Sequence, residues 1–345
     1  MKVQGVYISS VGTYLPQPVS AEEAIAQGLY DQELYDTIGW RGTHVAGRQS
    51  APDMAVLAAR QALGRQGELG EPVESFLHSG AFYQGPDEVS VPGYIMRELG
   101  LDGIPSLDIR QGCNGMLAGV EVAVGRLTGA ARCESALITS SENHSTPLID
   151  RWRGSAPGIV MGDGAAAVTL SSEGGFAEIV AANSSTLPAL EGWHRGDDDL
   201  LPPQEPTFQP LSLGRTVEEF TKSTMAMTEA IELISKFSLD LVQRSIVDAG
   251  INASDVAALI SVNADGRALE QWFLEPLGIP AGRTSWEIGR TVGHVGGCDQ
   301  FISLDRMLAS GTVGPGDHII LHAAAPGWSG TTLAVRITER PPWLD

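Results

Sequence analysis

The sequence has few cysteines and no long apolar segment, and each absence excludes a class of protein. Its 345 residues contain three cysteines, Cys113, Cys133 and Cys298, which are too few and too scattered for a disulfide framework, and no CxxC pair predicts a metal site. No apolar run reaches the roughly 18 residues that span a bilayer, and the first residues lack the basic and apolar regions of a signal peptide. We therefore expect a cytoplasmic protein with reduced thiols, no membrane contact and no bound metal.

Basic residues are also scarce. Lysine and arginine total 22 against 42 aspartates and glutamates, which gives a formal net charge of −20. Nucleic acids and anionic membranes are poor partners for such a chain, because a phosphate backbone requires a basic surface. The hydrophobic content of 43% without a low-complexity tract instead predicts a globular protein, long enough for two fused α/β units.

Two distant stretches of the chain share one order of predicted elements. Residues 105–142 and 284–327 each give a short apolar strand, a glycine-flanked turn, an amphipathic helix and a second strand. Strands that alternate with helices in this way predict an α/β protein with mainly parallel sheets covered by helices. We therefore predict two similar halves, residues 1–175 and 176–345. An exposed irregular excursion from Gly192 to Gly214 in the second half is either a surface loop or the border of a substrate channel.

A cysteine lies at the turn before the first of these helices. Residues 111–115 read Gln-Gly-Cys-Asn-Gly. A cysteine at a helix start is next to unpaired N–H groups and the positive end of the helix dipole, which favour the nucleophilic thiolate. The flanking glycines allow a tight turn and close approach of a ligand. A buried structural cysteine is the commoner alternative; we assign that role to Cys133 and the role of nucleophile to Cys113.

The matching turn of the second half carries a histidine and an aspartate. Residues 293–299 read Gly-His-Val-Gly-Gly-Cys-Asp. If the two halves pack about a pseudo-two-fold axis, the two helix starts converge and bring His294 to Cys113. Asp299 then orients the imidazole and stabilises its charged form. The alternatives are a structural histidine and an aspartate that only complements the helix dipole.

Four segments together resemble the ketoacyl-acyl carrier protein synthase III enzymes. They are GVYISSVGTYLPQPVS, LDIRQGCNGMLAGV around Cys113, GIVMGDGAAAVTL, and GDHIILHAAAPGWSGTTLAVRI. The resemblance implies a thiolase fold with a layered α-β-α-β-α arrangement and a homodimer. It also implies an acyl-thioester substrate that loads its acyl group onto Cys113.

The chain departs from this family at two positions that serve carbon–carbon bond formation. Where condensing members have a His-Gln-Ala-Asn-x-Arg motif, residues 261–267 read Ser-Val-Asn-Ala-Asp-Gly-Arg, so Val262 replaces the histidine; where they have Gly-Asn, this chain has Gly293-His294. Valine cannot stabilise an enolate by hydrogen bonding. A Cys-His-Asp set suits transfer to a hydroxyl or amine, and so resembles the family's acyltransferases of antibiotic pathways, which act on sugars or polyketide intermediates. The alternatives are decarboxylating condensation with a malonyl thioester and a non-catalytic paralogue.

The resemblance also implies positions for the remaining site residues. Backbone N–H groups of Cys113 and Gly327 form the oxyanion hole, because the neighbouring Pro326 has no N–H. Arg151 and Arg267 match arginines that contact coenzyme A. We expect a coenzyme A thioester as substrate, an acyl carrier protein as the alternative donor, and no permanently bound cofactor.

Two weaker signals lie in the first half. The run Gly162-Asp163-Gly164, in a strand-rich segment, predicts a close backbone approach beside the cysteine turn. His144 follows a predicted strand near the expected mouth of the site. It is a second candidate for acid–base chemistry, behind His294.

Overall fold

The computed structural model describes the chain apart from residues 67–69, 131–132, 154–157, 202–209 and 345. The first half contains β1 (Tyr7–Tyr14), β2 (Gln17–Ser20), α1 (Ala21–Ala26), α2 (Gln32–Thr37), β3 (Gly42–Val45), α3 (Ala51–Arg65), β4 (Phe76–Ser79), α4 (Val91–Leu99), β5 (Ser106–Ile109), η1 (Gly112–Asn114), α5 (Gly115–Thr128), β6 (Ser135–Glu142) and β7 (Gly164–Ser171). The second half contains β8 (Ala177–Thr186), η2 (Pro188–Leu190), α6 (Gly192–Arg195), α7 (Leu213–Ser223), α8 (Met227–Ala249), η3 (Ala253–Asp255), β9 (Val256–Ile260), α9 (Gly266–Leu269), η4 (Glu270–Leu274), α10 (Glu275–Leu277), α11 (Trp286–Val292), η5 (Gly296–Cys298), α12 (Asp299–Ser310), β10 (His318–Ala325), η6 (Pro326–Trp328), β11 (Ser329–Ile337) and η7 (Pro342–Leu344).

A nine-stranded sheet runs through both halves of the described chain. Its order is β5-β4-β6-β7-β1-β8-β11-β10-β9, so the second half repeats the first in mirror order about the centre. The pairs β4–β5, β4–β6 and β9–β10 are parallel, and the pairs nearer the centre are antiparallel. The sheet is therefore mixed rather than mainly parallel. One reason is local: β10 and β11 are joined by a short turn, which permits only an antiparallel pair.

The two halves meet where β1 pairs with β8. This contact is antiparallel and short, with Tyr7 opposite Glu178 and Ile8 opposite Ala177. The predicted boundary at residue 175 lies in the connection between β7 and β8. The counterpart of β5 in the second half is reduced to one bridge between Leu259 and Thr284.

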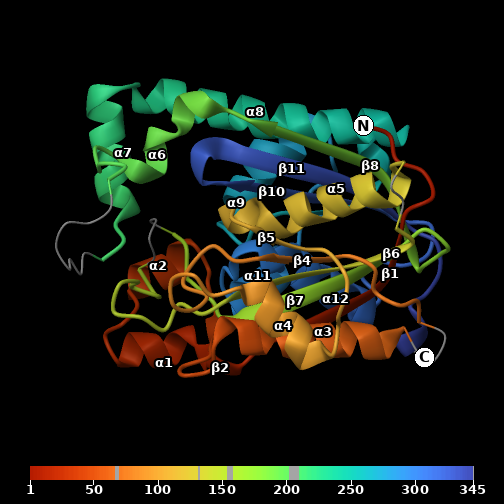
Figure 1. Ribbon diagram of the computed structural model, residues 1–345. Helices are drawn as coiled ribbons and strands as arrows, with labels where there is room; N and C mark the ends of the chain where they lie inside the picture. The colour runs from red at the N-terminus through yellow and green to blue at the C-terminus, as the bar shows by residue number, and fades with distance from the viewer. Residues whose placement is uncertain (67–69, 131–132, 154–157, 202–209, 345) are drawn as a thin grey trace.

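The helices form layers around the strands, as Figure 1 shows, with α8 on one outer face and α3 with α4 on the other. Helix α8 packs on β8, β10 and β11, and α3 packs on β1, β6 and β7. Helix α5 lies between the halves, because it contacts β4, β5 and β6 of the first and β8, β10 and β11 of the second. Nine of the twelve residues of α12 are buried, as expected for a central helix in a layered fold.

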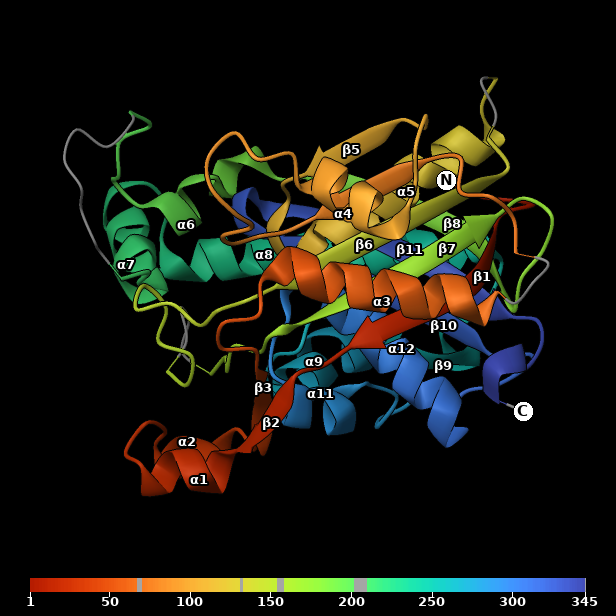
Figure 2. The same ribbon diagram turned by 60° about the horizontal axis from the view of Figure 1, so that its bottom comes forward.

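The N-terminal segment after β1 projects from the main body with β2, α1 and α2, as Figure 2 shows. Its return strand β3 leads back toward the second half. The buried Trp40 packs edge-on against Trp286 of α11, with ring centroids 4.9 Å apart. This segment therefore closes over one side of the second half.

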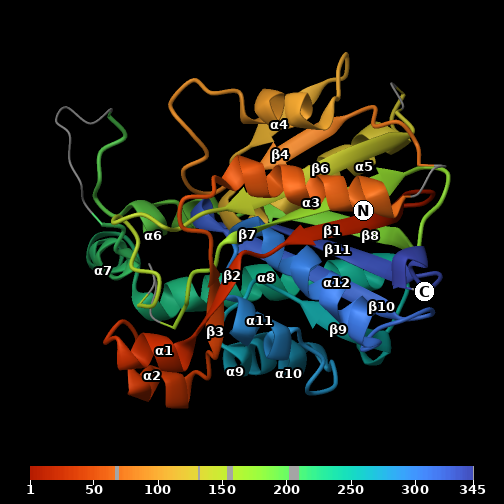
Figure 3. The same cartoon turned by 90° about the horizontal axis from the view of Figure 1, so that it is seen from below.

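Helices α6 and α7 stand together at one end of the molecule (Figure 3). They enclose a small apolar cluster that includes Leu190, Trp193 and Phe220. The excursion predicted from Gly192 to Gly214 is thus helical at both ends, and residues 202–209 lie outside the described residues. No helix in the described part of the chain is long and apolar enough to cross a membrane.

Candidate active site

The two helix starts converge as the duplicated plan predicts. Cys113 lies in η1, immediately before α5, and His294 lies just before η5 and α12. The Cys113 Sγ is 2.9 Å from His294 Nε2. The two residues come from different halves, and the contact exists only because η1 and η5 pack against each other.

Asp299 completes the set from the first residue of α12. Its Oδ2 is 2.6 Å from His294 Nδ1, and the aspartate is fully buried. The carboxylate also accepts the backbone N–H groups of Val295 and Asn263, both at 2.7 Å. These bonds fix the carboxylate, so the proton on Nδ1 points at it and Nε2 is presented to the cysteine.

The charge state of His294 follows from its two neighbours. Burial by itself disfavours the imidazolium, but the negative charges of the Cys113 thiolate and of Asp299, with their hydrogen bonds, outweigh it and raise the pKa of His294 well above its ordinary value. The histidine therefore holds a proton readily, and the three residues form a cysteine–histidine pair held by a carboxylate. Such a pair supplies a nucleophile and an acid at the same position.

The backbone of His294 is held by the first half. Its N–H donates to Val160 O at 2.7 Å, and its carbonyl accepts the N–H of Gly162 at 2.9 Å. Residues 160–162 thus pair with the histidine turn and not with the cysteine turn, which corrects the expected place of this glycine run. A side chain at Gly162 would meet Val292 O at 2.5 Å, so only glycine allows this approach.

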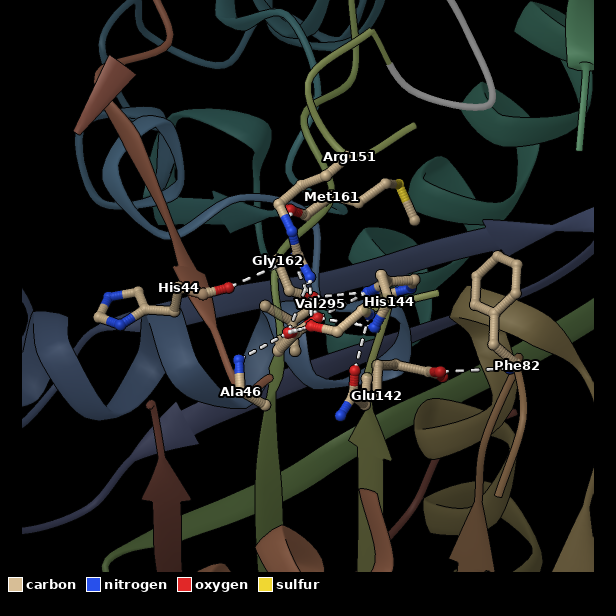
Figure 4. A network of polar contacts seen from close by, with 12 residues as sticks. His44, Ala46, Phe82, Glu142, His144, Arg151, Met161, Gly162 and Val295 are labelled. Atoms are coloured by element: carbon tan, nitrogen blue, oxygen red, sulfur yellow. Dashed lines mark hydrogen bonds and ion pairs between the residues drawn. The ribbon is translucent and has the colours of Figure 1, made fainter. Parts of the chain in front are cut away.

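A buried ion pair fixes the segment that holds His294. Arg151 contacts Asp163 through both terminal nitrogens, at 3.0 and 2.9 Å, and the aspartate also accepts N–H groups of Ala46 and His144. Burial by itself would raise the pKa of Asp163, but the hydrogen bond from His144 and the charge of Arg151 hold it well below its ordinary value. Figure 4 shows Arg151, His144 and Ala46 in this network.

Two sequence-based expectations change as a result. The Arg151 side chain is 11% exposed, and its guanidinium also donates to the carbonyl of Met161. Arg151 therefore stabilises the fold, and its guanidinium is not presented to coenzyme A. His144 is buried, and its Nδ1 lies 2.8 Å from Gly162 O. It is therefore a supporting residue and not a second acid–base group.

A cavity of about 800 Å³ opens onto Cys113 and His294. Its walls come from α6, α7, α8, α9, η4 and β10, and they are mostly apolar, with Val262, Phe273 and Trp328 among them. Both ends of the predicted excursion contribute, through Trp193 and Leu213, so it does border the cavity. A separate hollow of about 540 Å³ beside Phe82 and Tyr83 contains no residue of the Cys-His-Asp set.

The predicted oxyanion turn lies against the cysteine turn. A side chain at Gly112 would meet Pro326 Cδ at 3.0 Å, so η6 packs directly on η1. Gly327 follows with a left-handed φ of 78°. The donor role of Gly327 and of the Cys113 N–H stays a prediction.

Arg267 is placed near the cavity but outside its lining. Its side chain is 64% exposed and pairs with Asp265, which does line the cavity. Its contact with coenzyme A also stays a prediction. The backbone N–H of Asn263, which holds Asp299, was missed by the sequence analysis because a main-chain donor leaves no signature in residue type.

Comparison with known proteins gives a consistent assignment. The family model described as 3-Oxoacyl-[acyl-carrier-protein (ACP)] synthase III matches residues 107–187, and the model of its C-terminal part matches residues 246–337. Beta-ketoacyl-[acyl-carrier-protein] synthase III of Pseudomonas aeruginosa strain LESB58 is 27% identical over 346 residues, covering 98% of each chain. Acetoacetyl CoA synthase NphT7 of Streptomyces sp. strain CL190 is 23% identical, covering 94% of this chain and 96% of its own.

Solved structures agree. The structure of ChlB3, described as an acyltransferase, is 34% identical with a TM-score of 0.90, covering 98% of this chain and 99% of its own. FabH from Pseudomonas aeruginosa PAO1, at 22% identity and a TM-score of 0.78 over 98% of this chain and all of its own, has the same fold. The chain therefore belongs to the 3-oxoacyl-[acyl-carrier-protein] synthase III family and is a transferase of that kind.

Proposed function

We propose that this protein moves an acyl group from a thioester donor, through a Cys113 acyl-enzyme, to a hydroxyl or amine. The contacts of His294 with Cys113 and Asp299, at 2.9 and 2.6 Å, carry the proposal. The similarity to the ChlB3 acyltransferase supports it.

In the first step, the Cys113 thiolate attacks the thioester carbonyl carbon. The carbon–sulfur bond of the donor breaks, and the departing thiolate takes the proton of the His294 imidazolium. The products are the acyl-cysteine, a free donor thiol and a neutral histidine. The N–H groups of Cys113 and Gly327 would stabilise the oxyanion that forms on the way.

In the second step, neutral His294 acts as a general base. It removes the proton of the acceptor hydroxyl or amine as that group attacks the acyl carbon. The bond from the acyl carbon to Cys113 breaks, and the thiolate returns to its place beside the imidazolium. Asp299 holds the ring through both steps, so no side chain needs to move.

The absence of a second polar group at Val262 separates this reaction from condensation. Val262 lines the cavity and is packed against the main apolar core. A decarboxylating condensation forms an enolate that requires hydrogen-bond donors, and valine supplies none. Attack by a hydroxyl or amine requires only a base, which His294 provides.

Intact-mass spectrometry tests the proposal. The protein and its Cys113→Ala and His294→Ala variants are incubated with a panel of acyl-coenzyme A donors and then with hydroxylated acceptors. We expect an adduct that requires Cys113 and that discharges onto an acceptor only when His294 is present. An adduct that never discharges onto any hydroxyl or amine but releases carbon dioxide with malonyl thioesters would refute the transfer.

One observation favours condensation as a second candidate. His322 of β10 lines the same cavity, and its neighbour Leu321 pairs with Ile260 at the end of β9, close to Val262. Burial lowers the pKa of His322 to about 4, so it is an uncharged imidazole that could replace the missing histidine. Release of labelled carbon dioxide from malonyl thioester together with a ketide product, both lost in His322→Phe, would establish this reaction.

The partners are part of the proposal. A secondary-metabolite acceptor such as a sugar fits the likeness to the acyltransferase subgroup, and the donor is a coenzyme A thioester or an acyl carrier protein. The net charge of −20 disfavours an acyl carrier protein as donor, because such proteins are themselves acidic and would need a local basic patch to dock. The exposed edge strand β5, with Leu107 38% exposed, supports a homodimer.

A further inference from the structure

One wall of the cavity carries a histidine that the Cys-His-Asp set does not use. His194 lies on α6 and borders the cavity together with Cys113 and His294. Burial lowers its pKa to about 4, so its imidazole is uncharged near neutral pH. It is therefore suited to hydrogen bonding rather than to charge pairing or proton uptake.

The contacts of the ring indicate which nitrogen is available. His194 Nδ1 is covered from solvent and has no hydrogen-bond partner among the described residues. A neutral imidazole has one N–H and one lone pair. Placing the lone pair on the covered Nδ1 puts the N–H on Nε2, at the other edge of the ring. Because His194 lines the cavity while its Nδ1 is covered, we assign Nε2 as the nitrogen that faces the ligand.

Trp328 packs beside His194 in this wall, and its backbone is in a strained conformation. Its φ is +47°, a left-handed conformation that bulky residues rarely adopt. The indole stands 5.4 Å from the His194 ring at 31°, and edge-on to Trp193 at 5.9 Å. Strain of this kind persists only where surrounding contacts enforce it, and it gathers at ligand sites.

The wall is close to the reacting atoms. Trp328 directly follows Gly327, and the same turn packs through Pro326 on Gly112, next to Cys113. A group bound against Trp328 and His194 therefore occupies the same cavity as Cys113. Helix α6, which carries His194, lies beside α7 at the end of the molecule seen in Figure 3.

We propose that His194 is a specificity-determining residue that donates a hydrogen bond from Nε2 to an oxygen of the substrate held against Trp328. The oxygen is a hydroxyl, ether or carbonyl, and it is not the one that reacts. It belongs to the acyl group or to the acceptor, since both occupy this cavity. The inference rests on the proposed acyl transfer.

Two variants separate the hydrogen bond from the ring. His194→Phe keeps an aromatic ring on Trp328 and removes the donor, whereas His194→Gln keeps an N–H at a similar reach. His318→Phe is the matched control, because His318 lies at the far end of β10 and does not line the cavity. Thermal unfolding of each variant shows whether it is folded.

The experiment has two arms. The first compares Cys113 acylation by coenzyme A thioesters that differ by one oxygen, such as butyryl and 3-hydroxybutyryl. The second compares discharge of one acyl-enzyme onto cyclohexanol and tetrahydropyran-4-ol. In one of the two arms we expect the wild type and His318→Phe to prefer the compound with the additional oxygen. His194→Phe should reduce that preference about tenfold, and His194→Gln should keep most of it.

The outcomes are distinct for the two proposals. A preference that His194→Phe leaves unchanged in both arms, or no preference in the wild type, overturns the role of His194 while the acyl transfer stands. If no adduct forms at all, the transfer fails instead. Calorimetric binding of the same thioester pair to Cys113→Ala, with and without His194→Phe, then tests the hydrogen bond without turnover, and equal discrimination by both proteins overturns it.

Discussion

The turns before α5 and α12 have the same backbone conformation, but their side chains differ in chemistry. Gly112 and Gly296 begin them with φ of 52° and 58°. The residues that precede α5 and α12 also agree, with φ and ψ of −84° and −13° at Asn114 and −82° and −21° at Cys298. Cys113 therefore corresponds to Gly297, so the second half has no counterpart of the nucleophile.

The difference between the turns has a steric reason. A side chain at Gly297 would meet Ser140 Oγ at 3.0 Å and the backbone N of Met116 at 3.2 Å, within the first half. The second half instead places its chemistry on either side of that glycine, at His294 and Asp299. Duplication thus supplied two equivalent helix starts, and close packing between them left room for one nucleophile.

The largest effect is expected from removing the one nucleophile. Cys113→Ala should lower transfer by at least about 10⁴-fold, because the covalent route is lost. Cys298→Ala, in the matching turn, should still acquire the acyl adduct and lose only about 1 kcal/mol of stability. Intact mass and thermal unfolding measure both. An adduct on Cys298 in the Cys113→Ala protein would contradict the assignment.

Removing the carboxylate should have the next largest effect. Asp299→Asn should slow transfer by about 10²- to 10⁴-fold, because the amide no longer fixes the ring and one cause of the raised His294 pKa is lost. The His294 pKa should fall, which shifts the pH profile of transfer to lower pH. Asp305→Asn, in the same helix and paired with Arg65, is the control. Equal profiles in the two variants would exclude the role of Asp299.

The buried pair of Arg151 and Asp163 in the first half should stabilise the segment that holds His294. Arg151→Leu should lower stability by about 3 kcal/mol at neutral pH, because Asp163 is left buried without its partner. Because the pKa of Asp163 is depressed, this contribution is present above the unfolded value near about 4 and is lost as pH falls through the folded value. The difference in the free energy of unfolding between the wild type and Arg151→Leu should therefore become smaller in acid.

Denaturant unfolding at a series of pH values between neutral and acid measures this difference in unfolding free energy. Arg153→Leu is the control, because Arg153 pairs with Asp31 at a surface where both side chains are about half exposed. We expect a loss below about 1 kcal/mol there. A similar loss in both variants would show that the buried pair does not stabilise the segment.

The smallest effect is expected from adding a side chain at Gly297, where neighbouring atoms leave no room for one. Gly297→Ala should cost about 1–3 kcal/mol, because its Cβ has no room beside Met116 and Ser140. Gly125→Ala, on α5 where a Cβ meets nothing within 4 Å, should instead stabilise by up to about 1 kcal/mol. Denaturant unfolding compares the two. If Gly297→Ala were neutral, crowding would not explain why one half lacks the nucleophile.

The duplicated plan and the encounter of Cys113 with His294 were predictable from sequence. Both follow from local signals, namely apolar periodicity and glycine-flanked turns before helices, and from the assumption that similar halves pack symmetrically. The mixed sheet was not predictable in the same way, because strand direction at the centre depends on how β1 and β8 meet. No residue pattern near either strand records that contact.

The role of Arg151 shows a second limit. The sequence around an arginine in a loop does not indicate whether its side chain contacts a ligand or a buried carboxylate. The partner of Arg151, Asp163, is identified only by the fold. The wall formed by His194 and Trp328 was missed for a related reason. Each residue is unremarkable in sequence, and the site exists only because a helix packs on a distant turn.

The backbone of His294 donates a hydrogen bond to Val160 O and accepts one from the N–H of Gly162, so the position of the histidine depends on folding of the first half. A chain in which only the first half has folded carries Cys113 without His294 beside it. The reactive pair is assembled when the last strands join the sheet. We expect the reactivity of Cys113 to change when the halves unite, and the rate of its alkylation during refolding would report that moment.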